Sequence, residues 1–158
     1  MMRRLLATMV LALLLLGIHA QVGNAARMEF ETQCLGVEED GSQTLRAWGF
    51  GNKKKDAVEQ AMKNAVRDVL FKGIREGMEG CNMRPMITEV NARERHTDYF
   101  NRFFADGGKY KSFVSLKDEN KKKSRESVKS SLGTRWSVTV RVLCPKLREH
   151  LKKDKIIQ

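Results

Sequence analysis

Residues 44–73, TLRAWGFGNKKKDAVEQAMKNAVRDVLFKG, constrain the fold more than any other stretch of the chain. They predict a strand with Trp48 and Phe50 on one face, a turn at the glycines that flank Phe50, and then an amphipathic helix. The helix is predicted to begin near Asp56, because lysines in its first turn would oppose the helix dipole. Its alanines recur every four residues and predict close contact with a sheet, at Ala57, Ala61 and Ala65.

The glycine-rich turn GFGNKKKD does not predict nucleotide binding, because it lacks the spacing of a dinucleotide fingerprint and a GK[ST] ending. The chain also has no GxSxG, HExxH or calcium-loop pattern, and no CxxC pair to begin a zinc site. Beyond residue 26 the only histidines are His96 and His150, which leaves few groups for acid–base chemistry. We therefore predict a protein that is not an enzyme and has no catalytic residues, no metal and no cofactor.

The start of the chain has the pattern of a secretory signal peptide. Arg3 and Arg4 precede an apolar run at residues 9–18, and small residues follow it. The run is shorter than the ~20 residues that a transmembrane helix needs, and no cysteine near its end offers a site for a lipid anchor. We predict a signal peptide over residues 1–20, with cleavage possible up to residue 26, and a periplasmic or secreted protein without a transmembrane helix.

Residues 27–158 are predicted to form a single α+β domain, since their number is typical of one domain. Alternating polar and apolar residues predict further strands at 27–37, 109–116, 124–132 and 134–144. The strands at 27–37 and 44–50 are predicted to form a hairpin with a turn at Gly41.

Two more helices are predicted towards the C-terminus. The first covers residues 88–105, with Thr88 as its N-cap. The second is a short basic helix after Pro145, with Leu147, Leu151 and Ile156 packed inward. The predicted fold is therefore α+β: an antiparallel sheet of four to five strands, two main helices packed largely on one face, and a short basic C-terminal segment.

Cysteine use leaves the covalent structure open. An oxidising compartment allows one disulfide, formed by one pair among the three cysteines, and leaves one thiol over. The alternative is that all three are buried free thiols, because an unpaired cysteine behaves as a small apolar residue. The three are Cys34, Cys81 and Cys144.

The formal net charge of +11 favours anionic partners such as acidic polymers or lipid headgroups. The lysines gather in three clusters, and a shared anion-binding role requires these clusters to converge on one face. The candidate anion-binding residues are Lys53, Lys54, Lys55, Lys121, Lys122, Lys123, Lys152 and Lys153. An aromatic helical face fits the edge of a core better than a base-stacking platform, so nucleic acid is not a favoured partner. That face comprises Tyr99, Phe100, Phe103 and Phe104.

The element Trp48-Gly49-Phe50-Gly51, followed by the alanine-ridged helix from Asp56 to Val69, resembles the N-terminal domain of flagellar assembly protein T and related small bacterial envelope lipoproteins. The resemblance covers about thirty of the 158 residues. It implies a non-enzymatic α+β module that builds or lines an envelope assembly. We therefore predict an exported or periplasmic interaction protein, a structural or accessory component of a bacterial envelope assembly, with a protein partner or self-association. The alternative is a binding module for an anionic polymer or lipid headgroup that uses the basic clusters.

Overall fold

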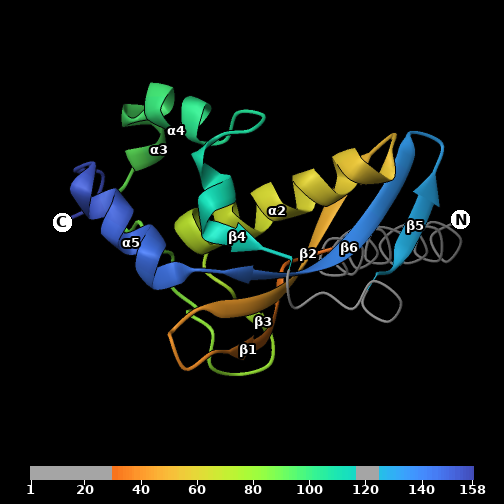
Figure 1. The fold of residues 1–158 in the computed structure, drawn as a ribbon, viewed down its shortest axis with the longest axis horizontal. Helices are drawn as coiled ribbons and strands as arrows, with labels where there is room; N and C mark the ends of the chain where they lie inside the picture. Colours follow the sequence, from red (N-terminus) through yellow and green to blue (C-terminus); the bar gives the residue numbers. More distant parts are fainter. Residues whose placement is uncertain (1–29, 117–124) are drawn as a thin grey trace, which may run out of the picture. The chain divides into compact units, whose positions relative to one another are not determined.

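The structure is a computed structural model that describes residues 30–116 and 125–158. Residues 32–158 form one compact unit, and the predicted signal peptide lies outside the described residues. Figure 1 shows a curled sheet with helices above it. The strands are β1 (Gln33–Val37), β2 (Gln43–Gly51), β3 (Glu76–Gly77), β4 (Val114–Ser115), β5 (Ser127–Ser130) and β6 (Gly133–Val142). The helices are α2 (Lys54–Phe71), α3 (Ala92–Arg95), α4 (Thr97–Phe103), the 3-10 helix η1 (Lys109–Phe113) and α5 (Cys144–Lys153).

The sheet has the strand order β3-β1-β2-β6-β4, and β5 pairs with the first part of β6. The α+β class is confirmed, but the prediction of a purely antiparallel sheet of four to five strands is wrong. Six strands are described, and β1 runs parallel to β3. The extra strand arises because the chain after α2 returns alongside β1, where Gln33 pairs with Glu76. The β1–β2 hairpin is confirmed, and Gly41 has the positive φ of 77° that its turn requires.

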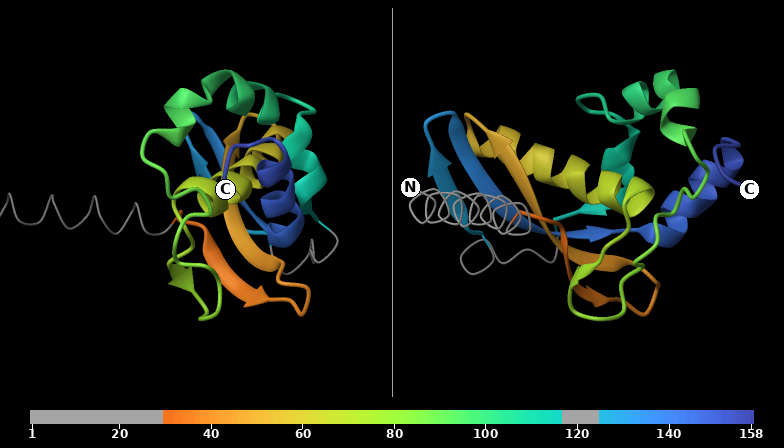
Figure 2. Two further views of the ribbon diagram at one scale, coloured as in Figure 1. Left: turned by 90° about the vertical axis from the view of Figure 1, so that its left-hand side faces the viewer. Right: turned by 180° about the vertical axis from the view of Figure 1, so that it is seen from behind.

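Helix α2 lies along β2 and β6 on one face of the sheet (Figures 1 and 2). The predicted close contact is confirmed, because all three alanines of the ridge are fully buried. A Cβ atom at Gly49 would lie 2.0 Å from the carbonyl oxygen of Ala57. The absence of a side chain at Gly49 therefore allows α2 to pack closely on β2, and no ligand is needed to explain this glycine.

The predicted start of α2 near Asp56 is wrong, since the helix begins at Lys54 with Lys53 as its N-cap residue. Lys53 makes no side-chain capping bond, but its backbone carbonyl accepts the amide of Ala57 at 3.1 Å. The ammonium of Lys54 lies 4.5 Å from the centroid of the Trp136 ring, and this cation–π contact offsets part of the dipole penalty.

The predicted helix over residues 88–105 is two short helices, and Thr88 is not its cap. α3 follows Asn91, which has a left-handed φ of 58°, and the chain turns at His96 before α4. The hydroxyl of Thr97 donates to the carbonyl oxygen of Glu94 at 2.6 Å, a local bond that competes with helix continuation.

The predicted strand over residues 109–116 is mostly η1, with only β4 extended. Tyr110 and Phe113 are three residues apart and both buried, which fits the three-residue turn of a 3-10 helix.

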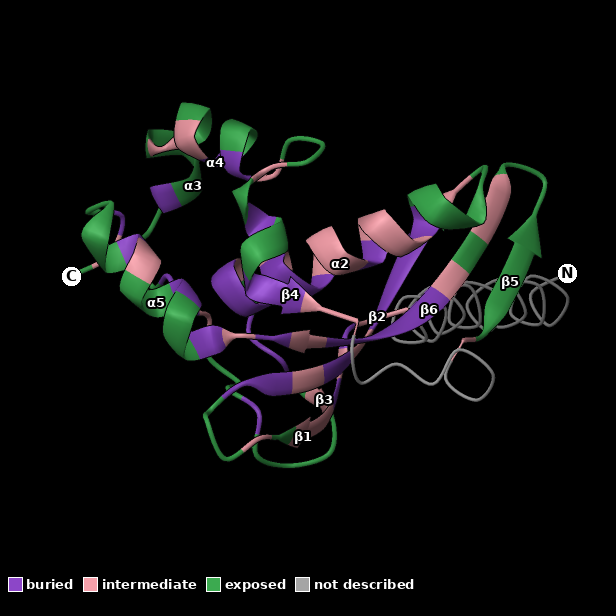
Figure 3. Cartoon of the chain, viewed as in Figure 1, coloured by how far each residue is buried: buried purple, intermediate pink, exposed green. Residues whose placement is uncertain are grey.

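Buried side chains hold helix α5 against η1 and α4. Figure 3 shows buried positions alternating with exposed ones along α5. The rings of Phe103 and Phe113 are stacked with centroids 6.0 Å apart, and the His150 ring stacks on Phe113 at 5.0 Å. The predicted inward residues of this helix are confirmed as buried: Leu147, Leu151 and Ile156. The aromatic residues of α4 thus belong to the core or its edge. No helix within residues 30–116 and 125–158 has the length and apolar character to cross a bilayer.

Candidate anion-binding groove

Within the described residues, the structure does not bring the first and the last of the predicted lysine clusters together. Lys53, Lys54 and Lys55 lie at the start of α2, whereas Lys152 and Lys153 lie at the end of α5. Figure 1 shows these sites at opposite ends of α2, a helix of 18 residues that is ~27 Å long at 1.5 Å per residue. The third cluster, Lys121 to Lys123, lies outside the described residues.

A cavity of about 1220 Å³ lies between the loop at residues 81–89, the α3–α4 region and the end of α5. It is larger than the roughly 300–1,000 Å³ of ordinary small-molecule sites. We call it the basic groove, after the basic residues that line it: Arg84, Arg95, Arg148, Lys152 and Lys155.

The basic residues approach the groove from two sides. Arg148, Lys152 and Lys155 follow one another at helical spacing along α5 and its end, and so they share a face. Arg84 comes from the 81–89 loop, and Arg95 from α3. Together they form an electrostatic focus for a negatively charged ligand.

Few acidic groups neutralise these charges. Glu89 is the only acidic side chain among the lining residues, and its carboxylate forms an ion pair with Arg95. Within the described parts of the chain, no ion pair engages Arg84, Arg148, Lys152 or Lys155. Four positive side chains are therefore available to a ligand.

The acid at the end of α5 is already engaged. The hydroxyl of Tyr99 donates to Oδ2 of Asp154 at 2.9 Å, and Nε2 of His150 lies 3.3 Å from the same oxygen. Burial, helped by this hydrogen bond, raises the pKa of Tyr99. The network fixes α5 on α4 and thereby sets where its basic face lies.

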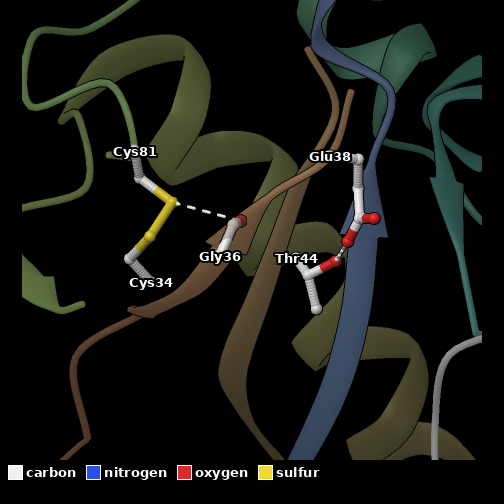
Figure 4. The surroundings of a disulfide bond; sticks show 5 residues. All are labelled: Cys34, Gly36, Glu38, Thr44 and Cys81. Carbon is white, nitrogen blue, oxygen red and sulfur yellow. Dashed lines mark hydrogen bonds between the residues drawn. A yellow bond between two sulfur atoms is a disulfide. The ribbon is translucent and has the colours of Figure 1, made fainter. Parts of the chain in front are cut away.

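The 81–89 loop is tied to the body of the fold at three points. A disulfide joins Cys81 to Cys34 of β1 (Figure 4), while Cys144 is a buried free thiol. The carbonyl of Asn82 accepts the Ile74 amide at 2.9 Å. Further along, the amides of Met86 and Ile87 donate to the carbonyl oxygens of Val69 and Leu70, each at 2.9 Å. One wall of the groove is thus preorganised by α2 and by β1.

The opposite wall ends in a C-cap that departs from the usual sequence. The amide of Lys155 donates to Lys152 O at 3.0 Å, and the amide of Ile156 donates to Leu151 O at 2.9 Å. This is the Schellman arrangement, whose left-handed position is usually glycine. Here it is Lys155, with φ of 56°. A basic side chain therefore replaces the residue that would fit the backbone best.

Sequence reasoning found Lys152 of this groove and missed the other four basic residues. The spacing of Arg148, Lys152 and Lys155 is a readable signal of a basic helical face, but these residues do not form a run of consecutive lysines. Arg84 and Arg95 carried no such signal, because only the path of the 81–89 loop brings them opposite α5. No group of acidic residues, histidines and cysteines suited to a metal ion occurs in the described part of the chain.

Comparison with protein-family models, curated proteins and solved structures found no match to this chain.

Proposed function

We propose that this protein is a non-enzymatic, exported or periplasmic binding module that captures an anionic partner in the basic groove. The observation that carries the proposal is the set of four basic side chains without an ion pair around one cavity. These side chains surround a groove in which the 81–89 loop is already held in place, so binding needs little further ordering of the protein.

The setting of this module is part of the same proposal. The signal-peptide pattern at residues 1–20 and the Cys34–Cys81 disulfide both support an oxidising compartment outside the cytoplasm. The resemblance of residues 44–73 to envelope modules supports an accessory role in a bacterial envelope assembly. The anionic partner would then be a component of that envelope.

The proposal is tested by titrating the protein with inorganic tripolyphosphate at several salt concentrations. Charge reversal at Arg148→Glu with Lys152→Glu should weaken binding at least tenfold, because it removes adjacent cations from the groove. The matched control is Lys53→Glu with Lys55→Glu, which makes the same change of charge at the other end of α2 and should alter affinity less than twofold. Equal losses in both double variants would refute the groove as the site.

A second candidate function, self-association, is favoured by an exposed apolar patch at the β5–β6 turn. The side chain of Leu132 is 80% exposed and that of Phe50 is 39% exposed. The Phe50 ring lies against Gly133, where an added Cβ would be 2.7 Å from it, and Gly133 directly follows Leu132 in the chain. Apolar surface beside an edge strand is typical of protein contacts.

Self-association is tested by measuring molar mass in solution over a hundredfold range of protein concentration. We expect a dimer that Leu132→Asp converts to a monomer, whereas Met78→Asp, at an exposed methionine elsewhere, leaves the mass unchanged. A monomer at every concentration would remove this candidate and leave the groove proposal untouched.

A further inference from the structure

We infer that the ligand of the basic groove is a single-chain amphiphile with an anionic head group. The inference rests on the proposed function, because it names the chemical class that the same groove would take. It begins from the floor of the groove, which is apolar although its rim is charged. The buried apolar residues that line it are Val69, Met86, Ile87 and Ile156.

A small inorganic ion would use only part of this site. The cavity of about 1220 Å³ far exceeds what one phosphate needs, and the apolar floor would gain nothing from contact with it. Burial of an alkyl chain on that floor releases water from apolar surface on both partners, which is the main favourable term in such binding. Met83, which is 64% exposed, adds apolar surface at the open rim.

The basic residues suit the head group of such a ligand. Arg84 and Arg148 carry guanidinium groups, which can hold phosphate or carboxylate oxygens in a two-pronged manner. Lys152 adds a point charge beside Arg148 on α5. Phosphate and carboxylate heads share this recognition, and the experiment below separates them.

An acidic peptide fits the groove less well. An extended peptide gains affinity by hydrogen bonding to free backbone groups at a strand edge. The amides of Met86 and Ile87 already donate to α2 carbonyls, so these two positions on the groove wall offer no amide for pairing. A flexible chain that needs no backbone partners matches the surface better.

Lys155 adds a positive charge at the rim from a backbone position that favours glycine. A non-glycine residue in the left-handed region carries a steric backbone cost. The structure shows this cost at a residue that lines the groove. Glycine would relieve the cost but would remove the ammonium group.

The first experiment measures dissociation constants for hexyl, octyl, decyl and dodecyl phosphate below their micellar concentrations, with the full chain. We expect about two- to fourfold tighter binding per added methylene, as burial of one methylene predicts. Inorganic phosphate tests the head alone, the matching alkyl carboxylates test the second head chemistry, and a dodecyl maltoside tests the chain alone. We expect inorganic phosphate and dodecyl maltoside each to bind more weakly than dodecyl phosphate.

Three outcomes overturn the inference. They are affinity that does not change with chain length, a maltoside that binds as tightly as dodecyl phosphate, and a hexaglutamate peptide that binds more tightly than any alkyl phosphate. If chain length has no effect but tripolyphosphate still binds in the groove, the proposed function stands and only the amphiphile is lost. If neither the alkyl phosphates nor tripolyphosphate binds, both the amphiphile inference and the proposed function are refuted.

Two exposed methionines give a matched pair of variants that leaves the core intact. Met83 and Met78 are each 64% exposed, but only Met83 lines the groove. Met83→Ser should weaken dodecyl phosphate binding about threefold without changing the affinity for inorganic phosphate, while Met78→Ser should change neither. Equal effects of the two variants would contradict the placement of the chain.

Lys155→Gly tests whether the charge of Lys155 contributes to binding, because the variant removes the ammonium group without destabilising the fold. It should raise the thermal midpoint because glycine suits the left-handed position, and it should weaken dodecyl phosphate binding about three- to tenfold. The dependence on chain length should stay the same, since the floor is unchanged. Unchanged affinity would show that Lys155 does not contact the head group.

Discussion

Removing the Cys34–Cys81 disulfide should cost about 4 kcal/mol of unfolding free energy. The two cysteines are 47 residues apart in sequence, and the chain-entropy estimate for a loop of that length gives about 4 kcal/mol at 25 °C. Cys34 is 1% exposed and Cys81 is 8% exposed, so a Cys34→Ala, Cys81→Ala double variant also loses some buried sulfur. Set against the roughly 5–15 kcal/mol of a typical domain, this is a large fraction of the total.

The assay is urea unfolding followed by tryptophan fluorescence, with and without a thiol reductant. Reduction of the wild-type protein should reproduce most of the loss, whereas the double variant should not respond to reductant. Cys144→Ala is the control, because this thiol is buried but not cross-linked. A double variant within about 1 kcal/mol of wild type would refute the reasoning, since the cross-link would then not restrict the unfolded chain.

The same variant tests how the groove is held. Cys81 begins the 81–89 loop, so opening the disulfide releases one of the three ties that fix this wall. Tripolyphosphate affinity should fall even under conditions where circular dichroism shows the double variant folded.

Three further predictions concern α2 and the free thiol. Gly49→Ala should lower the free energy of unfolding in urea by about 3 kcal/mol, because the added Cβ would lie 2.0 Å from the carbonyl oxygen of Ala57. An unchanged unfolding midpoint would mean that α2 can move away from β2. Lys53→Ser should raise stability by about 1 kcal/mol by adding the missing cap, and it should leave groove binding unchanged. Burial raises the pKa of Cys144 from 9.0 to about 11, so the folded state holds the proton more tightly and stability is lost as pH rises from 9 to 11. Cys144→Ala should remove that part of the pH dependence, and identical pH profiles would contradict it.

Local patterns predicted the elements whose periodicity is long and regular. The alternation of residues 134–144 and the alanine ridge of α2 each repeat over many residues, so one misplaced position does not hide them. The glycine spacing excludes a phosphate loop at Gly49 and Gly51, and the short distance from a Cβ at Gly49 to Ala57 gives a packing reason for the first of these glycines.

Elements decided by tertiary contacts could not be predicted in this way. The parallel pairing of β1 with β3 depends on how the chain returns after α2, and a two-residue strand carries no periodicity. The break at His96 and the 3-10 turn of η1 follow from where Phe100, Phe103 and Phe113 must enter the core. The groove itself requires the 81–89 loop to face α5, which no local pattern encodes.

The pairing of β2 with β6 has a consequence for the order in which the chain can fold. These two strands lie side by side at the centre of the sheet, although their paired residues are about 80 to 100 positions apart in sequence. Contacts between such distant segments must overcome a large loop-closure entropy, which slows folding. Until β6 pairs with β2, α2 can pack on β2 alone. In a chain still emerging during synthesis or export, the part of the apolar face of α2 that packs on β6 would therefore be exposed. A holding chaperone that recognises it would bind the protein only while β6 is still missing from the sheet.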